Sequence, residues 1–242
     1  MRIALISDLH GNRVSLSAVL EDAGKVGVDQ VICLGDVATL GPRPHEVLET
    51  LEARDIPCIL GNHDAFMLDE ELIRTYTEVP IVVEAVDWCR DRMTKDELAF
   101  LAGFRASIRV DLGAGADALF FHGSPRSHME DLLATTSAAE LDEGLAGQKA
   151  TVMAGGHTHI QMLRQHHGML LVNPGSVGMP FREFANGCAP CILAHAEYAI
   201  VESDRGVVSV SLRRVAVDRH RLRDEARGSD NPICRSLELQ YA

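Results

Sequence analysis

Five short polar segments carry the residue types that bind metal ions and activate water. They contain carboxylates, imidazoles and one amide, in chain order Asp8 and His10; Asp36; Asn62, His63 and Asp64; His122; and His157 and His159. This mixture of ligands suits manganese, iron, cobalt, nickel or zinc, whereas calcium and magnesium prefer oxygen ligands throughout. The pattern therefore predicts a site for borderline divalent cations.

The spacing of these residues also allows for two ions. Two ions about 3.5–4 Å apart need a ligand that contacts both, and the two oxygens of a carboxylate can do this. Asp36 is the one candidate ligand of its segment, so we expect it to be the bridge. His157 and His159 are two positions apart, and in an extended segment their side chains would point the same way and supply one ligand to each ion.

Each polar segment follows an apolar run that predicts a strand, at 2–7, 30–34, 56–60, 118–121 and 151–154. Helices predicted at 13–26 and 44–54 alternate with the first strands, which favours parallel strands whose carboxyl ends share one edge. Open α/β sheets bind ligands at that edge. Other predicted strands lie at 107–112, 160–165, 169–173, 191–202 and 207–215, and T/S-x-x-E capping boxes at Thr94 and Ser137 predict two more helices.

Gly61, Asn62, His63 and Asp64 come directly after the apolar run at 56–60. A glycine, an amide, an imidazole and a carboxylate in succession favour a tight loop over a helix or a strand. Asn62 and His63 are adjacent, so their side chains should diverge and serve two different roles around one site.

The composition indicates a globular protein without a basic surface. The chain has 242 residues, 46% of them hydrophobic, and a formal net charge of -12, which disfavours binding to nucleic acid or an anionic membrane. We expect one domain over 1–242, with a core at about 1–215 and a charged, irregular tail at 216–242. No signal peptide or apolar run of about 20 residues is present, so we expect a cytoplasmic protein with reduced thiols. Cys188 and Cys191 have CxxC spacing, but no further ligands lie nearby, and we assign them no function.

The motifs stand in the order typical of the calcineurin-like metallophosphoesterase superfamily, which the chain resembles over about residues 1–215. The matching segments are Asp8-x-His10, Gly35-Asp36, Gly61-Asn62-His63-Asp64, His122-Gly123 and Gly156-His157-x-His159. The segments 8–12, 122–125 and 173–178 also resemble its small bacterial and archaeal phosphodiesterase branch. One departure follows Gly178, where that branch typically has Gln-Pro-Arg and this chain has Met179-Pro180-Phe181-Arg182, which predicts a different substrate choice.

The resemblance implies an α/β fold, a four-layer αββα sandwich of two mixed β-sheets flanked by helices. It also implies the ligand set: Asp8, His10 and His159 for one ion, Asn62, His122 and His157 for the other, and Asp36 between them. His63 would face the substrate phosphate rather than a metal. Asp64 would orient and charge His63, or else cap a helix.

The expected reaction is in-line attack on phosphorus by a hydroxide held between two cations, manganese being the first candidate. His63 would stabilise or protonate the leaving alkoxide. Arg126 and Arg182 are candidate contacts to the phosphate or the leaving group. The predicted enzyme is a phosphodiesterase acting on a small or nucleotide-like substrate, without a membrane partner, and a homo-oligomer is left open.

Other functions of the same fold remain as alternatives. They are a non-catalytic scaffold, a phosphomonoesterase, a dinucleotide polyphosphate hydrolase and a DNA nuclease. The complete ligand set and the presence of His63 disfavour the scaffold, and the net charge of -12 disfavours the nuclease.

Overall fold

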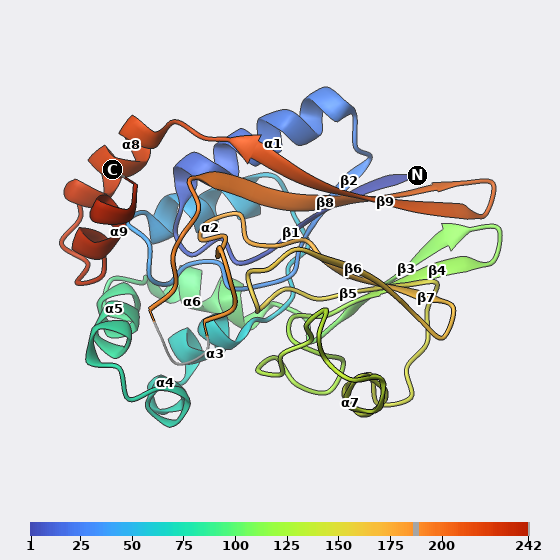
Figure 1. Cartoon of the computed structure of the whole chain (residues 1–242). Helices are drawn as coiled ribbons and strands as arrows, with labels where there is room; N and C mark the ends of the chain where they lie inside the picture. The colour runs from blue at the N-terminus through green and yellow to red at the C-terminus, as the bar shows by residue number, and fades with distance from the viewer. Residues whose placement is uncertain (186–188, 242) are drawn as a thin grey trace.

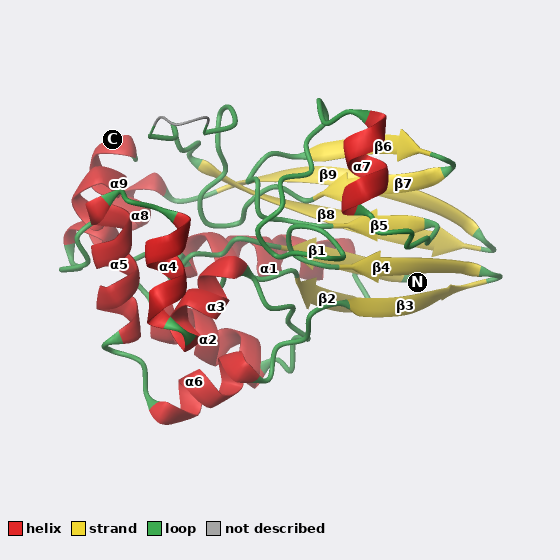
Figure 2. Ribbon diagram, turned by 90° about the horizontal axis from the view of Figure 1, so that it is seen from below, coloured by secondary structure: helices red, strands yellow, loops and turns green. Residues whose placement is uncertain are grey.

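Two mixed β-sheets pack face to face in the computed structural model, which describes residues 1–185 and 189–241 (Figures 1 and 2). The first sheet has the order β2-β1-β8-β9 and contains β1 (Arg2–Ile6), β2 (Gln30–Cys33), β8 (His195–Asp204) and β9 (Val207–Ala216). The second has the order β3-β4-β5-β7-β6 and contains β3 (Ile108–Gly113), β4 (Ala116–Phe120), β5 (Val152–Ala154), β6 (Met162–His166) and β7 (Met169–Asn173). Parallel pairs join β1 to β2, β4 to β5 and β5 to β7, and the remaining pairs are antiparallel.

Helices cover the outer face of each sheet, so the predicted four-layer αββα arrangement is confirmed. On the first sheet, α1 (Arg13–Val26) contacts β8 and β9. The other helices of this apolar cluster pack beside it: α2 (Pro44–Ala53), α3 (Asn62–Leu68), α4 (Glu70–Tyr76), α5 (Pro80–Arg90), α6 (Lys95–Ala102), α8 (Arg219–Arg227) and α9 (Cys234–Gln240). In the described residues the second sheet is covered by α7 alone (Ala138–Gly144), through Leu141 (Figure 1). Ile3, Leu5, Phe120 and Val152 belong to the apolar layer between the sheets.

Side-chain caps begin α1, α6 and α7. Asn12 accepts a hydrogen bond from the backbone of Ser15 at the start of α1. Thr94 and Ser137 form the two predicted capping boxes, at α6 and α7. Cys33 and Cys58 are buried free thiols. The CxxC motif includes Cys188, which lies outside the described residues.

The strand predicted at 56–60 is not a full strand. Cys58 forms one isolated bridge to Cys33, and Ile59 forms another to Arg105. Pro57 accepts a hydrogen bond from Cys33 through its carbonyl oxygen but has no N–H to donate, which limits a regular ladder here. The segment still runs beside β2 and delivers residues 61–64 to the same edge.

The prediction of an irregular tail at 216–242 is wrong. The segment forms α8 and α9, which pack against each other and against the main core through Leu222, Ala226, Cys234 and Leu237. Each helix has only two buried positions, about one per turn, and the polar and charged residues between them concealed this pattern. None of the described helices has the length and apolar character needed to cross a bilayer.

Candidate metal centre

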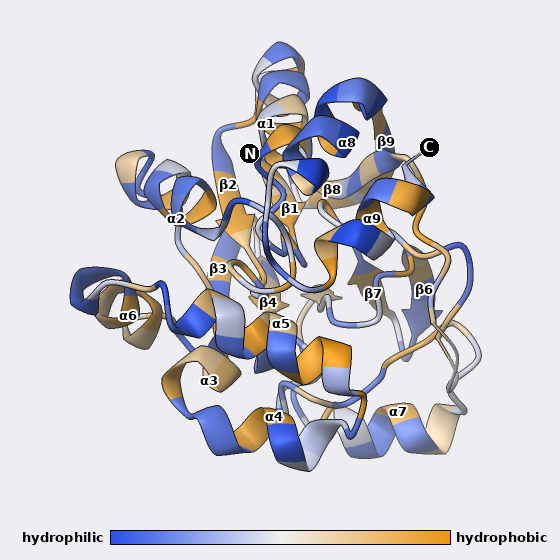
Figure 3. Cartoon of the chain, turned by 90° about the vertical axis from the view of Figure 1, so that its left-hand side faces the viewer, coloured by the Kyte–Doolittle hydropathy of each residue, from blue (hydrophilic) through white to orange (hydrophobic). Residues whose placement is uncertain are grey.

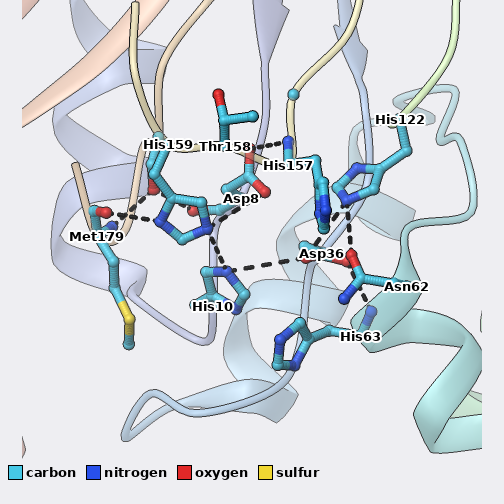
Figure 4. Close-up of polar contacts among 12 residues, drawn as sticks. Asp8, His10, Asp36, Asn62, His63, His122, His157, Thr158, His159 and Met179 are labelled. Carbon is cyan, nitrogen blue, oxygen red and sulfur yellow. Dashed lines mark hydrogen bonds and ion pairs between the residues drawn. The ribbon is translucent and has the colours of Figure 1, made fainter. Parts of the chain in front are cut away.

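The carboxyl ends of β1, β2, β4 and β5 meet at one edge of the sandwich. The loops that follow them, together with the start of α3, bring seven side chains into one cluster: Asp8, His10, Asp36, Asn62, His122, His157 and His159 (Figure 4). Backbone hydrogen bonds fasten the loops to one another, from Asp8 N to Gly35 O and from His10 N to Asp36 O. The positions of the candidate ligands are thus set by the two sheets.

Asp8, His10 and His159 form the first group. The Nε2 atoms of His10 and His159 lie 3.1 Å apart, and His159 Nε2 lies 3.4 Å from Asp8 Oδ1. Asp8 Oδ1 is buried and has no hydrogen-bond partner among the described residues. A buried carboxylate oxygen normally has a partner, so its position beside two converging imidazole nitrogens fits a bound cation.

Asp36, His122 and His157 form the second group, and Asn62 joins it. The ligand atoms of Asp36, His122 and His157 lie within 4.8 Å of one another. His122 Nε2 lies 3.0 Å from Asn62 Oδ1 and 3.4 Å from Asp36 Oδ2. The same Asp36 oxygen lies 3.9 Å from His10 Nε2, so Asp36 faces both groups. The two groups fit a dinuclear site for divalent cations.

Carbonyl oxygens orient two of the imidazoles. His122 Nδ1 lies 2.7 Å from Leu34 O, and His159 Nδ1 lies 2.7 Å from Met179 O. A carbonyl oxygen can only accept, so each Nδ1 carries a proton, and Nε2 is the nitrogen that would bind a metal once it has given up any proton of its own. In the first group, Thr39 Oγ1 lies 3.3 Å from His10 Nδ1 and orients that imidazole in the same way.

Sequence reasoning missed these supporting contacts, because a backbone carbonyl leaves no mark in the sequence. It also missed Asp131, whose Oδ1 lies 3.4 Å from His157 Nε2 and which follows no strand. Ser176, in the segment 173–178, fastens two of these loops, since it donates to Asp8 O and accepts from Met179 N, both at 2.7 Å.

Five of the candidate ligands have a left-handed backbone. The φ angles are 53° at Asp8, 44° at His10, 58° at Asp36, 69° at His157 and 57° at His159. Such conformations are unfavourable for residues with a side chain and cluster at functional sites. The segment 157–159 is therefore not extended, and the geometric premise for its two histidines is wrong, although each imidazole does enter a different group.

The charges of the cluster compensate one another. Burial opposes ionisation of Asp36, but His122 and His63 outweigh it and hold the pKa of Asp36 well below its usual range. Burial also opposes protonation of His122, but the carboxylate of Asp36 raises the pKa of His122 to about 9. Burial and His122 lower the pKa of His157 to about 3, so that imidazole stays neutral, as a metal ligand must.

The loop predicted at 61–64 is in fact the start of a helix. Gly61 is the N-cap of α3, and Asn62, His63 and Asp64 form its first turn. The residues still diverge as expected, because adjacent positions on a helix point in different directions. A Cβ on Gly61 would lie 2.1 Å from Asp36 Oδ1, so this position needs glycine.

Asp64 caps backbone groups. Its carboxylate accepts hydrogen bonds from the backbone N–H groups of Asp36, Val37 and Gly61, at 2.8, 2.9 and 2.9 Å. None of the hydrogen bonds in the described residues joins it to the ring of His63. Of the two roles expected for Asp64, the cap is the one that the structure supports, and it fixes the loop that carries Asp36. Burial and the charge of Asp36 raise the pKa of Asp64 to about 6.

His63 lines a cavity of about 440 Å³ above the cluster, together with His10, Asp36, Asn62, His157 and His159. Its Nδ1 is buried and unpartnered among the described residues. Its ring contacts His10, Phe66 and Tyr76 edge-on, with centroids 5.0, 5.1 and 6.4 Å apart. His63 is thus held at the cavity with a free ring nitrogen (Figure 4).

The two arginines are not brought to the cluster. Arg126 forms ion pairs with Glu130 and Glu143, and Arg182 pairs with Glu183 on the surface. Met179 and Phe181 do line the cavity. They belong to the segment 179–182, which differs from the related branch, and Phe181 stacks on His159 with ring centroids 4.2 Å apart.

The chain belongs to the calcineurin-like phosphoesterase superfamily. The family model described as the calcineurin-like phosphoesterase superfamily domain matches residues 1–195. An uncharacterized protein of Methanocaldococcus jannaschii is 29% identical over 215 residues, which cover 82% of this chain and 84% of that protein.

Two solved structures are similar over nearly the whole chain. A metallophosphoesterase from Sphaerobacter thermophilus has a TM-score of 0.77 at 26% identity and covers 100% of this chain and 98% of its own. A hypothetical protein from Pyrococcus horikoshii has a TM-score of 0.80 at 18% identity, with 98% and 96% covered, and shares the fold. The family model, together with the match to the Sphaerobacter thermophilus protein, makes the chain a metallophosphoesterase by family and suggests a hydrolase of phosphoric esters.

Proposed function

We propose that the chain is a dinuclear metal-dependent phosphodiesterase for small or nucleotide-like phosphodiesters. One observation carries this proposal: Asp36 Oδ2 lies 3.4 Å from His122 Nε2 and 3.9 Å from His10 Nε2, between two sets of ligands. Mixed nitrogen and oxygen ligands suit manganese, which is the first metal to test, followed by iron, cobalt, nickel and zinc. The preference for diesters over monoesters is our inference from the resemblance to the phosphodiesterase branch.

The residues divide into two ligand sets. Asp8, His10 and His159 would hold one ion, Asn62, His122 and His157 would hold the other, and Asp36 would contact both. Two divalent cations, when bound, lower the pKa of water to near neutrality and neutralise the phosphoryl oxygens. The carbonyl groups of Leu34 and Met179 accept from Nδ1 of His122 and His159, so Nε2 is the nitrogen of each ring that would bind an ion.

His63 is the proposed catalytic residue of the chain itself. Burial lowers the pKa of His63, so the ring is neutral near pH 7 and one of its nitrogens carries a proton. From its place in the cavity, this N–H can donate to the oxygen of the leaving group as negative charge develops there. Asp64 acts as a positioning residue, through the loop of Asp36 and the start of α3.

Hydrolysis assays on metal-stripped protein test the proposal. Stripped protein should be inactive on bis(p-nitrophenyl) phosphate and regain activity with added manganese. Asp36→Ala should abolish that recovery, whereas His45→Ala, on α2 and outside the cavity, should not. Full activity after chelation would refute the proposal. A higher kcat/KM on p-nitrophenyl phosphate would assign the chain as a monoesterase instead.

A further inference from the structure

The cavity above the cluster has one polar end and one apolar wall. The polar end consists of the candidate ligands and His63. The wall is lined mainly by aliphatic and aromatic side chains from three parts of the chain: Tyr76 at the end of α4, Val79 before α5, and Ile81 and Val82 in α5; Met179, Phe181 and Ile192 after β7; and Ile233 and Leu237 at α9. The third part reaches the cavity because α9 packs back onto the core.

Several of these side chains are exposed to solvent, so they are not part of the buried core. Tyr76 is 45% exposed, Val79 51% and Ile81 40%. Apolar side chains that gather around a cavity with a polar end are typical of a ligand site. The helices α4, α5 and α9 lie on one face of the molecule, where apolar stretches of α5 and α9 are visible (Figure 3).

The described lining contains no lysine or arginine. Gln240 is one of its few polar residues away from the cluster, and its Oε1 already accepts a hydrogen bond from Ile192 N. A polyphosphate would place further negative charges against this apolar wall, in a protein of net charge -12. Without cationic partners, no interaction with the protein would replace the lost hydration of those charges, so binding would be unfavourable.

We propose that the substrate is a phosphodiester with an apolar alkyl or aryl ester group, which binds against the wall formed by Val79, Ile81, Phe181, Ile192 and Leu237. This inference rests on the proposed phosphodiesterase function and specifies its substrate class. The phosphate sits at the polar end, and the apolar group extends toward Ile81. Met179 and Phe181 belong to the wall, so the departure at 179–182 contributes to this choice.

A homologous series of alkyl p-nitrophenyl phosphates measures the contribution of the wall. Each methylene that leaves water should raise kcat/KM by about threefold to fourfold, or about 30-fold to 60-fold from the methyl to the butyl ester. Diadenosine tetraphosphate should be hydrolysed more slowly than the butyl ester. Equal kcat/KM along the series, with hydrolysis present, would overturn the apolar assignment and leave the phosphodiesterase proposal intact.

Ile81→Asp tests the wall directly, since Ile81 is exposed and its replacement should not prevent folding. The variant should reduce the increase from methyl to butyl to less than threefold. Val207→Asp is the matched control, because Val207 is 72% exposed on the turn side of β9 and does not line the cavity. An unchanged slope in Ile81→Asp would contradict the assignment of Ile81 to the wall.

Binding of non-hydrolysable ligands separates this inference from the function on which it rests. Calorimetric titration of the manganese-loaded protein with butylphosphonate and methylphosphonate should give at least about tenfold tighter binding of the butyl compound. If no ester is hydrolysed but the ratio holds, the phosphodiesterase proposal fails and the apolar site stands. Equal affinities would refute the apolar site whatever the activity.

Discussion

Asn62 and His63 are neighbours at the start of α3, and their side chains face different partners. Asn62 Oδ1 lies 3.0 Å from His122 Nε2, while the ring of His63 faces the cavity. Asn62→Ala should therefore reduce the bound metal from two ions to one at limiting concentration. His63→Ala should keep both ions and lower kcat by about 10²–10⁴-fold. Metal analysis by mass spectrometry and steady-state kinetics on bis(p-nitrophenyl) phosphate measure the two effects.

Asn62→Ala and His63→Ala serve as controls for each other. His45→Ala is a further control, because it removes a histidine that does not line the cavity. Loss of one ion from His63→Ala would make His63 a ligand and contradict its assignment to the substrate. A normal metal content in Asn62→Ala would remove Asn62 from the second group.

Gly61 is required by its distance to Asp36 rather than by backbone conformation. Its φ is -85°, which any residue adopts, but an added Cβ would lie 2.1 Å from Asp36 Oδ1. Gly61→Ala should displace Asp36 and weaken metal binding by at least about tenfold, the range seen when a supporting group is lost. Titration calorimetry with manganese measures the change. Gly24→Ala is the control, since nothing lies within 4 Å of a Cβ there and the helix should gain about 0.5–1 kcal/mol. Equal metal affinity in both variants would show that Asp36 tolerates the displacement.

At the level of elements, α9 links the stability of the fold to the cavity. Leu237 is buried in the main core, while Leu239, two positions later, is 70% exposed. Leu237→Ala should lower the free energy of unfolding by about 2–4 kcal/mol. Leu239→Ala should change it by less than about 0.5 kcal/mol. Urea unfolding measures both, and equal effects would mean that α9 does not pack as described.

Asp22 joins α1 to β8 and β9 and gives the fold a pH-dependent contact. It accepts hydrogen bonds from Tyr198 Oη at 2.6 Å and Arg213 Nε at 3.0 Å. The bond from Tyr198, more than the charge of Arg213, lowers the pKa of Asp22. Since the folded pKa is below the unfolded value of about 3.9, the stabilisation is complete above that pH and is lost as pH falls through the folded pKa.

Asp22→Asn should consequently cost about 1–3 kcal/mol at pH 7 and less near pH 3. Unfolding curves of the wild type and the variant at both pH values measure the difference. A constant difference between them would show that the charge of Asp22 does not contribute.

The sequence predicted those elements whose signals are local. Strand β1, helix α1 and the capping boxes of Thr94 and Ser137 follow from apolar runs and caps. The start of α3 was missed because its cap is Gly61, whose partner Asp64 acts through three backbone groups rather than through a local side-chain pattern. The packing of α9 was missed because Leu237 is buried by contacts with distant parts of the chain. The seven residues of α9 are too few to show a periodic apolar pattern.

The candidate ligands were predictable because they follow strands, whose carboxyl ends the fold brings together. The left-handed backbone at His157 and the contact of Asp131 with His157 depend on how loops from different strands meet. The apolar wall was not predictable for the same reason, since Ile81 and Leu237 are far apart in the chain and meet only through the packing of α9.

At the scale of the whole molecule, the metal centre is a source of instability when no cation is bound. Burial raises the pKa of Asp8, and its Oδ1 has no partner among the described residues. Asp8→Asn removes that buried charge, so the metal-free variant should unfold at a higher temperature than the metal-free wild type. The wild type should gain about 2.7 kcal/mol per ion at 100 times Kd, or about 5–10 °C, and the variant should gain less. Thermal unfolding with and without a chelator would therefore give two curves that change order, with the variant more stable in chelator and the wild type more stable in manganese. A variant that is less stable in both conditions would mean that the carboxylate of Asp8 stabilises the fold by itself, and its role as a metal ligand would lose this support.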